Sequence, residues 1–170
     1  MGLRIRGRAW KLGNNISTDH IISGKYKFKS ISSLEGMIPY VFKEVIPGFH
    51  EKVREGDVLV AGRNFGMGSS REHAPRLLKL VGVGAVVAES FARIFFRNAI
   101  NIGLPVITAT LVPRITEDGD IISVNLEEGV ITNESKDVQE RFKPYPKEIL
   151  EVIRCGGIIE YIRKYGSLPW

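Results

Sequence analysis

The chain has 170 residues, 44% hydrophobic and 25% charged, which excludes disordered, collagen-like and disulfide-rich proteins and predicts one domain over residues 1–170. One cysteine, Cys155, cannot supply the ligands of a structural zinc site or an iron–sulfur cluster, and with only three histidines we expect no metal on this chain alone.

The net charge of +5 suits an anionic partner, and because the basic residues are scattered we favour a small acidic molecule over nucleic acid. No apolar run approaches roughly 18 residues and no apolar segment opens the chain, so we expect a cytoplasmic protein that does not span a membrane.

The first third of the chain is predicted to hold one strand, a loop and a helix. Residues 3–12 alternate between apolar and polar side chains, the pattern of a half-buried strand. Residues 13–20 are rich in Gly, Asn, Ser and Asp, which predicts a turn and loop. A short helix is expected over about residues 31–43, capped by Ser30 or Ser32.

The middle of the chain alternates strands with helices. The apolar runs Val58–Ala61, Ala85–Ala88 and Leu104–Thr108 predict strands. Between them, one helix is expected to begin near residues 72–74, and a second to be capped by Ser90 and ended by Gly103. This order predicts an α/β core with a parallel sheet.

The last third changes character. Residues 121–126 and 130–132, joined across a Glu-Gly turn, predict a β-hairpin. Two short helices are expected over about residues 146–154 and 158–165, separated by a pair of glycines. We therefore expect an α/β fold with a parallel-sheet core and a β-hairpin layer.

The densest group of chemistry-bearing residues is Gly62–Ala74, which leaves a predicted strand and enters a predicted helix. Its glycines permit a tight turn and close approach to a ligand, and a helix N-terminus offers unpaired N–H groups. Arg71 adds a fork of donors that matches a carboxylate, while Ser69 and Ser70 offer a candidate nucleophile or base. The pattern indicates an anion site. The alternative is a serine-capped helix beside a surface Arg–Glu pair.

A second cluster, Ser17–His20, lies in the first loop and is followed by the basic and aromatic run Lys25–Lys29. Taken alone, Asp19 is an Asx-turn or helix-capping residue, and His20 is a structural or surface histidine. The run Lys25–Lys29 taken alone is a solvated loop.

Three segments together resemble the small subunits of the isopropylmalate dehydratase and homoaconitase family, and the swivelling C-terminal domain of aconitase. They are Gly13–Asp19, Gly62–Ala74 and Ala88–Ala99, and the resemblance continues from Gly156 through the tail. It implies the β/β/α layers of a swivelling domain. It also implies a two-chain hydro-lyase whose large subunit holds a [4Fe–4S] cluster on three cysteines, so that this chain carries no cofactor itself.

The resemblance also implies roles for particular residues. Ser69 becomes the base that takes a proton from the substrate, while an open iron on the large subunit acts as Lewis acid on the leaving hydroxyl. A serine base needs its alkoxide stabilised, for which the N–H groups of the glycine-rich turn and Arg71 are available. Ser70 and Arg71 resemble contacts to a substrate carboxylate. Asp19 matches the aspartate of a Thr-Asp motif and is expected near Ser69 as an orienting residue.

In the family, the loop after the first motif is implied to select the substrate, and here it contains Tyr26, Phe28 and Lys29. Phe28 in the place of an arginine favours an apolar isopropyl group, whereas Lys29 near that place in a second alignment favours a distal carboxylate. We therefore expect interconversion of 2-isopropylmalate and 3-isopropylmalate, in leucine biosynthesis. The alternatives are homoaconitase or another 2-hydroxyacid dehydratase and, from a different class, a stand-alone RNA-binding or regulatory module.

Overall fold

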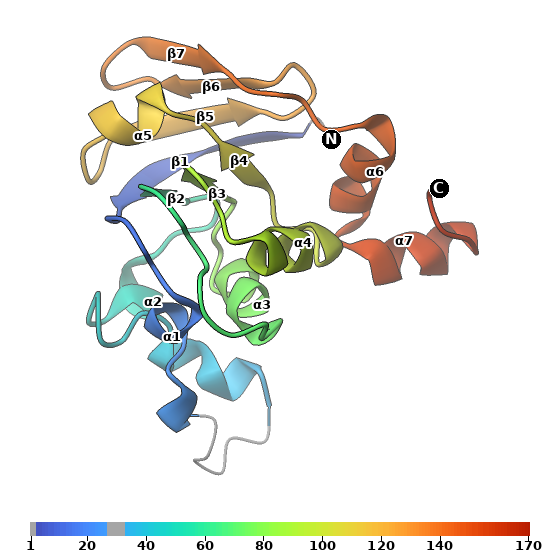
Figure 1. Ribbon diagram of the computed structural model, residues 1–170, viewed down its shortest axis with the longest axis horizontal. Helices are drawn as coiled ribbons and strands as arrows, with labels where there is room; N and C mark the ends of the chain where they lie inside the picture. Colours follow the sequence, from blue (N-terminus) through green and yellow to red (C-terminus); the bar gives the residue numbers. More distant parts are fainter. Residues whose placement is uncertain (1–2, 27–32) are drawn as a thin grey trace.

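A seven-stranded mixed sheet organises residues 3–26 and 33–170, the part of the chain that the computed structural model describes (Figure 1). The strand order is β4-β3-β2-β1-β5-β6-β7, with β1 to β4 parallel and β5 to β7 antiparallel. The strands are β1 (Arg4–Lys11), β2 (Val58–Ala61), β3 (Ala85–Ala88), β4 (Val106–Thr108), β5 (Ile121–Asn125), β6 (Val130–Asn133) and β7 (Val138–Arg141). The expected α/β fold with a parallel core and a β-hairpin is confirmed.

Strand β1 joins the two halves of this sheet. Its first residues, Arg4–Arg8, pair antiparallel with β5, and its last residues, Ala9–Lys11, pair parallel with β2. The hairpin therefore continues the sheet of the parallel core on the opposite edge of the same strand. Strands β2 and β3 are fully buried along their whole length, as their continuous apolar runs require.

Helices α3 and α4 connect the parallel strands and lie below the sheet in Figure 1, while α6 and α7 extend to one side. Within residues 3–26 and 33–170, no helix has the length and apolar character needed to cross a bilayer. The α-helices are α1 (Thr18–Ile21), α2 (Phe49–Lys52), α3 (His73–Leu80), α4 (Arg93–Asn101), α5 (Leu111–Ile115), α6 (Lys147–Cys155) and α7 (Ile158–Tyr165), and the 3₁₀ helices are η1 (Gly24–Tyr26) and η2 (Glu35–Tyr40).

Two predicted helix features differ in the structure. The helix expected over residues 31–43 is the 3₁₀ helix η2, because Pro39 lies inside it, lacks an N–H and disfavours the α conformation at the preceding residue. The prediction that Ser90 caps the next helix is wrong, since α4 begins at Arg93. The chain stays extended after Ser90 because Phe91 and Ala92 bridge to the backbone of Phe65.

A buried carboxylate stabilises β1 where its two halves meet. The side chain of Asp57 is 3% exposed and accepts four hydrogen bonds of 2.9–3.1 Å. The donors are the N–H and guanidinium of Arg8, the indole N–H of Trp10 and the N–H of Arg54. Burial raises the pKa of Asp57, but the four hydrogen bonds together outweigh it and hold the pKa below its ordinary value.

Replacing Asp57 by asparagine is expected to lower the free energy of unfolding by about 3 kcal/mol, because an amide leaves Arg8 without its counter-charge and offers one acceptor oxygen to four donors. Urea unfolding at pH 7 measures this loss. Because the folded-state pKa is depressed, the wild-type contribution is present above about pH 4 and is lost as the pH falls further, so the two proteins converge there.

The matched control is D137N, since Asp137 is exposed in a turn at a positive φ of 53° that asparagine also tolerates. Its effect should stay within about 0.5 kcal/mol. Equal stabilities of D57N and D137N would contradict the role given to the buried carboxylate.

Candidate active site

Two loops that leave neighbouring strands run side by side at one edge of the sheet. One follows β1 and the other follows β2, and because these strands are parallel their carboxyl ends meet at the same edge. Backbone hydrogen bonds of 2.7–2.8 Å join the loops: Asn15 N–H to the Arg63 carbonyl, Gly66 N–H to the Ile16 carbonyl, and Thr18 N–H to the Met67 carbonyl. The two clusters singled out in the sequence are thus one structure.

A third loop, which follows β3, holds the glycine-rich loop from its other side. Asn64 N–H donates to the hydroxyl of Ser90 at 2.8 Å, and Phe65 N–H donates to the Ser90 carbonyl at 3.0 Å. The ring of Phe65 is fully buried and packs edge-on against Phe91 and Phe95, with centroids 6.0 and 5.2 Å away. This aromatic anchor fixes the middle of the loop to α4.

Glycine is required at two positions of this loop. Gly66 and Gly68 have φ values of 85° and 106°, a region that other residues rarely adopt. A Cβ at Gly66 would overlap the ring of Phe95, and one at Gly68 would lie 3.2 Å from the hydroxyl of Thr18. The glycines let the loop pass closely over its neighbours.

Ser69 is held by its backbone, which leaves its half-buried hydroxyl available for chemistry. Its N–H donates to the hydroxyl oxygen of Thr18 at 3.1 Å, and Thr18 is 3% exposed. Its own hydroxyl oxygen accepts from the backbone N–H of Arg71 at 3.3 Å. The contact of Arg71 with Ser69 therefore runs through the main chain.

Neither serine caps the following helix. The N-cap of α3 is Glu72, and no side chain of the described residues bonds to the cap. The alternative interpretation of this segment as a serine-capped helix is wrong. Ser70 is exposed, and its carbonyl accepts from the side-chain amide of Asn98 in α4 at 3.2 Å.

Arg71 and Asp19 face each other across the two loops. Nη1 of Arg71 lies 3.6 Å from Oδ1 of Asp19, and the two side chains are 34% and 68% exposed. A pair this long and this exposed contributes little to stability, and it leaves other donors of the guanidinium available to a second carboxylate. Asp19 contacts Arg71, whereas Ser69 reaches this segment through Thr18.

Helix α1, which carries Thr18 and Asp19, is fixed by a reciprocal cap. The hydroxyl of Ser17 accepts from the N–H of His20 at 3.2 Å, and the N–H of Ser17 donates to Nδ1 of His20 at 2.8 Å. His20 is exposed, so the prediction of a structural or surface histidine is confirmed. The capping residue is Ser17, one of the preferred N-cap types, and Asp19 lies in the first turn.

The loop expected to select the substrate is only partly described. Phe28 and Lys29 lie outside the described residues. Tyr26 is buried at 5% exposure, donates its hydroxyl to Glu44 at 2.6 Å and stacks on Tyr40 at a centroid distance of 4.4 Å. The structure thus brings Asp19, Ser69, Ser70 and Arg71 together, and places Tyr26 in the packing between η1 and η2.

The sequence analysis missed three residues that position these loops. Thr18 accepts from Ser69, Asn98 supports Ser70, and Oδ1 of Asn14 accepts from the N–H of Arg63 at 2.7 Å. All three lie inside segments that carry the family resemblance. Their short polar side chains, set in a loop (Asn14), at the start of α1 (Thr18) and within α4 (Asn98), were the available signal.

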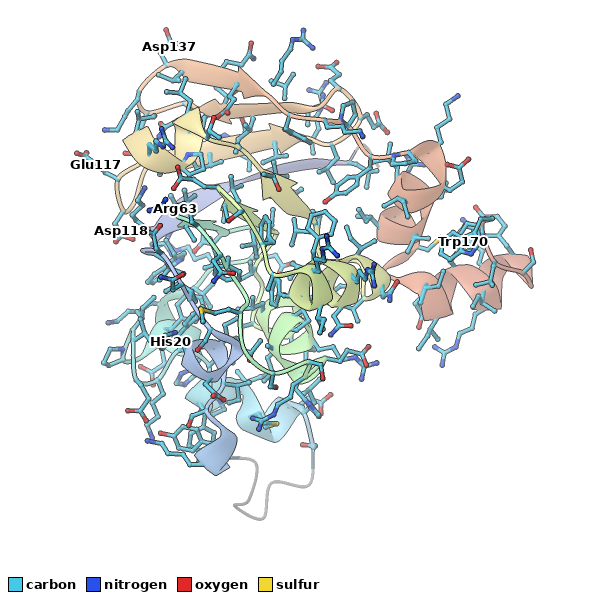
Figure 2. All side chains as sticks on the ribbon, in the orientation of Figure 1. His20, Arg63, Glu117, Asp118, Asp137 and Trp170 are labelled. Atoms are coloured by element: carbon cyan, nitrogen blue, oxygen red, sulfur yellow. The ribbon has the colours of Figure 1, made fainter. Side chains whose placement is uncertain are left out.

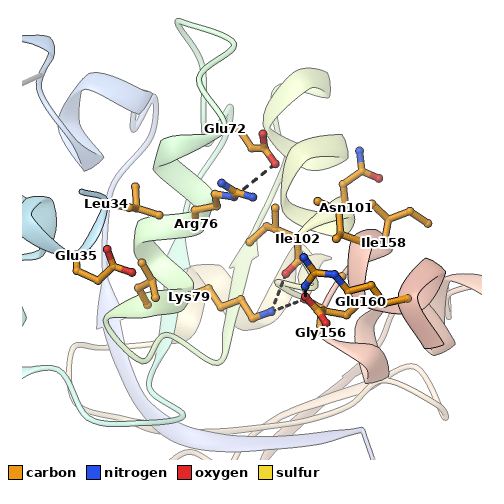
Figure 3. Close-up of a pocket in the computed structure, with 14 residues that line it drawn as sticks. Leu34, Glu35, Glu72, Arg76, Lys79, Asn101, Ile102, Gly156, Ile158 and Glu160 are labelled. Atoms are coloured by element: carbon orange, nitrogen blue, oxygen red, sulfur yellow. Dashed lines mark hydrogen bonds and ion pairs between the residues drawn. The ribbon is translucent and has the colours of Figure 1, made fainter. Parts of the chain in front are cut away.

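The candidate site does not coincide with the cavity formed by helices α3, α4 and α7. Figure 2 shows His20 and Arg63 on the same side of the molecule and Trp170 on the opposite side. A cavity of about 650 Å³ lies between α3, α4 and α7, and none of Asp19, Ser69, Ser70 and Arg71 lines it (Figure 3). Among the described residues, no group of three or more His, Cys, Asp and Glu side chains is placed to hold a metal ion.

Lys79 lines that cavity and joins three helices. Nζ of Lys79 in α3 donates to the carbonyl of Ile102 at 2.7 Å and to that of Gly156 at 2.8 Å, at the ends of α4 and α6 (Figure 3). Cations near helix C-termini are favourable, because the last carbonyls lack partners. Partial burial lowers the pKa of Lys79.

Comparison with known proteins shows the family of the chain. The aconitase C-terminal domain family matches residues 14–110, a range that contains every residue of the candidate site. The chain belongs to this family. The resemblance found in the sequence is confirmed, and the relatives that follow are named as small subunits.

Two curated relatives match nearly end to end. A 3-isopropylmalate dehydratase small subunit from Thermotoga maritima is 50% identical over 165 residues, covering 97% of this chain and 98% of the relative. A methanogen homoaconitase small subunit from Methanothermobacter thermautotrophicus is 48% identical over 160 residues, covering 94% and 91%. The crystal structure of a 3-isopropylmalate dehydratase from Methanocaldococcus jannaschii superposes with a TM-score of 0.86 at 39% identity, covering 96% and 95%.

Replacing Thr18 by valine is expected to loosen the loop at Ser69, because valine keeps the shape of threonine and removes the acceptor for the Ser69 N–H. The amide of Ser69 should exchange its hydrogen at least about tenfold faster, and the free energy of unfolding should fall by about 1–2 kcal/mol. Hydrogen exchange by NMR and urea unfolding measure the two effects. Thr18→Ser keeps the acceptor and should retain the protection, and unchanged exchange in Thr18→Val would contradict the assignment.

Proposed function

We propose that this chain is the small subunit of 3-isopropylmalate dehydratase, a hydro-lyase that interconverts 2-isopropylmalate and 3-isopropylmalate by dehydration and rehydration. The observation that carries the proposal is the solvent-accessible group formed by half-buried Ser69 and Arg71 and exposed Ser70 on the glycine-rich loop, with Asp19 opposite. The end-to-end identity to subunits of that name supports the same conclusion. We further propose that residues 1–170 form one domain, located in the cytoplasm.

The site is half of an active site, and a large subunit supplies the rest. A [4Fe–4S] cluster does not fit the residues of this chain, whose one cysteine, Cys155, is a free, half-buried thiol at the end of α6. We assign the cluster to the large subunit, where it would supply Lewis acidity toward the leaving hydroxyl. The remaining chemistry falls to the side chains of the two loops.

Ser69 is assigned as the base. Its oxygen, as the alkoxide, takes the proton from the carbon next to the one that loses hydroxide, a double bond forms between the two carbons, and the hydroxide leaves as water after taking up a proton. Rehydration in the opposite sense completes the isomerisation: the hydroxyl adds to the carbon that lost the proton, and a proton adds to the carbon that lost hydroxide. The backbone N–H of Arg71 already points at this oxygen and stabilises negative charge there. The N–H of Ser69 is engaged by Thr18, so it contributes to position and not to charge stabilisation.

Arg71 and Ser70 are assigned to a substrate carboxylate. The guanidinium offers a planar pair of donors, and its single long contact with Asp19 leaves other donors of the group for a carboxylate of the substrate. Asp19 then remains beside the guanidinium and keeps it oriented. The net charge of +5 favours the approach of such an anion.

Replacing Ser69 by alanine is expected to lower kcat at least about a thousandfold with KM nearly unchanged, because the base is lost and the anion contacts remain. The assay uses this chain reconstituted with a cluster-loaded large subunit from the same organism. The free energy of unfolding should change by less than about 0.5 kcal/mol.

The matched control is the neighbouring serine. Ser70→Ala should raise KM and leave kcat within about threefold, since Ser70 is assigned to binding. An active S69A enzyme would refute the assignment of the base. An inactive but correctly assembled wild-type complex, with steeply salt-dependent binding to RNA, would favour the binding-module alternative.

The alternative substrate is a homoaconitate-type tricarboxylate, favoured by the 48% identity to a homoaconitase subunit and by Lys29. Hydration of isopropylmaleate and of homoaconitate, measured side by side, decides between them. Phe28→Arg should shift activity toward the tricarboxylate, because an unpaired carboxylate in a dry site is costly and a cation removes that cost.

The converse variant tests Lys29. If the apolar assignment holds, Lys29→Met leaves the ratio of the two activities unchanged. A loss of homoaconitate hydration in Lys29→Met would instead make Lys29 the carboxylate partner and identify the chain as a homoaconitase subunit.

A further inference from the structure

The backbone at Gly24 lies directly against the guanidinium of Arg71. A Cβ added at Gly24 would lie 3.1 Å from Nη1, 3.4 Å from Nη2 and 3.7 Å from Cζ of Arg71. All three atoms belong to the flat end of one side chain, so the bare Cα of Gly24 faces the guanidinium group. The carboxylate of Asp19 lies 3.6 Å from the same Nη1.

Backbone strain does not explain a glycine at this position. The φ of Gly24 lies outside the positive range that favours glycine, whereas Gly66 and Gly68 lie inside it. Any residue can adopt the conformation of Gly24. A side chain at position 24 would instead reduce the space for Arg71. A Cβ only 3.1 Å from Nη1 requires the guanidinium to shift by a few tenths of an ångström.

The segment that contains Gly24 is itself anchored. The carboxylate of Glu44 accepts from the hydroxyl of Tyr26 at 2.6 Å and forms an ion pair with Nζ of Lys25 at 2.5 Å. The ring of Tyr26 stacks on Tyr40, and these contacts fix the two residues that follow Gly24. The ammonium of Lys25, then the hydroxyl of Tyr26, hold the pKa of Glu44 below its usual range, so the anchor is charged at neutral pH.

We propose that Gly24 is a positioning residue for Arg71: its bare backbone, fixed by the Glu44 anchor, sets the direction in which the guanidinium presents its two donors to the substrate carboxylate. Nη1 of Arg71 lies against both the backbone of Gly24 and the carboxylate of Asp19, while a third of the side chain remains exposed to a ligand. The inference rests on the proposed role of Arg71 and adds the residue that aims it. Bidentate recognition of a carboxylate depends on such aim, because two parallel hydrogen bonds must form together.

The test is Gly24→Ala in the complex reconstituted with the large subunit. KM should rise about tenfold with kcat within about threefold, because a misdirected guanidinium weakens binding of the substrate without removing the base. The matched control is Gly13→Ala. Gly13 also lies outside the positive φ range and a Cβ there would meet nothing within 4 Å, so both kinetic constants should be unchanged.

Two further variants separate the inference from the proposed function. Arg71→Lys in the wild-type background should raise KM, and Gly24→Ala should then add no further increase, because Gly24 acts only through the guanidinium. An unchanged KM in Arg71→Lys would overturn the proposed role of Arg71 itself. A raised KM in Arg71→Lys together with an unchanged KM in Gly24→Ala would overturn only the inference.

A readout without activity uses the isolated chain. The ¹⁵Nε–H resonance of Arg71 should shift in Gly24→Ala and stay in place in Gly13→Ala. Should Gly24→Ala fail to fold, Glu44→Ala releases the anchor from an exposed position and should raise KM in the same direction. An unmoved resonance, or additive effects of Gly24→Ala and Arg71→Lys, would overturn the inference.

Discussion

The parallel pairing of β1 with β2 is the constraint on which the candidate site depends. Asp19 and Ser69 are far apart in the sequence, yet they are close in space because the strands before them end at the same edge. Backbone hydrogen bonds between the two loops extend this pairing beyond the sheet, up to Thr18 and Met67. The positions of the two loops are therefore set by main-chain hydrogen bonds, to which the short side chains of Thr18 and Asn98 add contacts at Ser69 and Ser70.

Some polar groups of the two loops hold the loops in place, and others are left for contact with a ligand. The hydroxyl of Thr18 accepts from the N–H of Ser69, and the side-chain amide of Asn98 donates to the carbonyl of Ser70. Both serines are therefore fixed through their backbones. The N–H and the guanidinium of Arg71 face two different groups, the Ser69 oxygen and Asp19. The supporting side chains are short, and that of Thr18 is buried. The groups assigned to the substrate, Ser69, Ser70 and Arg71, are half-buried or exposed. Such an open arrangement suits a surface that is completed by another chain.

Most of the fold could be predicted from the sequence, because β2 and β3 are continuous apolar runs, and α3 and the hairpin show apolar periodicity. Helices α1 and α5 and strand β7 were not predicted, since each is only four or five residues long. Helix α5 and strand β7 also depend on partners remote in the chain, since Glu140 of β7 accepts from the first N–H groups of α5. The residues of the site were recognisable by type. The supporting roles of Thr18 and Gly24 were not, because they depend on which loops become neighbours after folding.

The shared strand β1 also has a consequence for synthesis of the chain from its N-terminus. Arg4 is paired with Asn125, so the first half of β1 is made more than a hundred residues before its partner. An unpaired strand edge is a template for association with other chains. Arg4, Arg6 and Arg8 alternate along that half, and this row of positive charge repels a second copy of the same strand. Arg6 can pair with Glu134 only after the hairpin has been synthesised. A charge that protects the edge of the unfinished chain thus becomes a contact of the finished sheet.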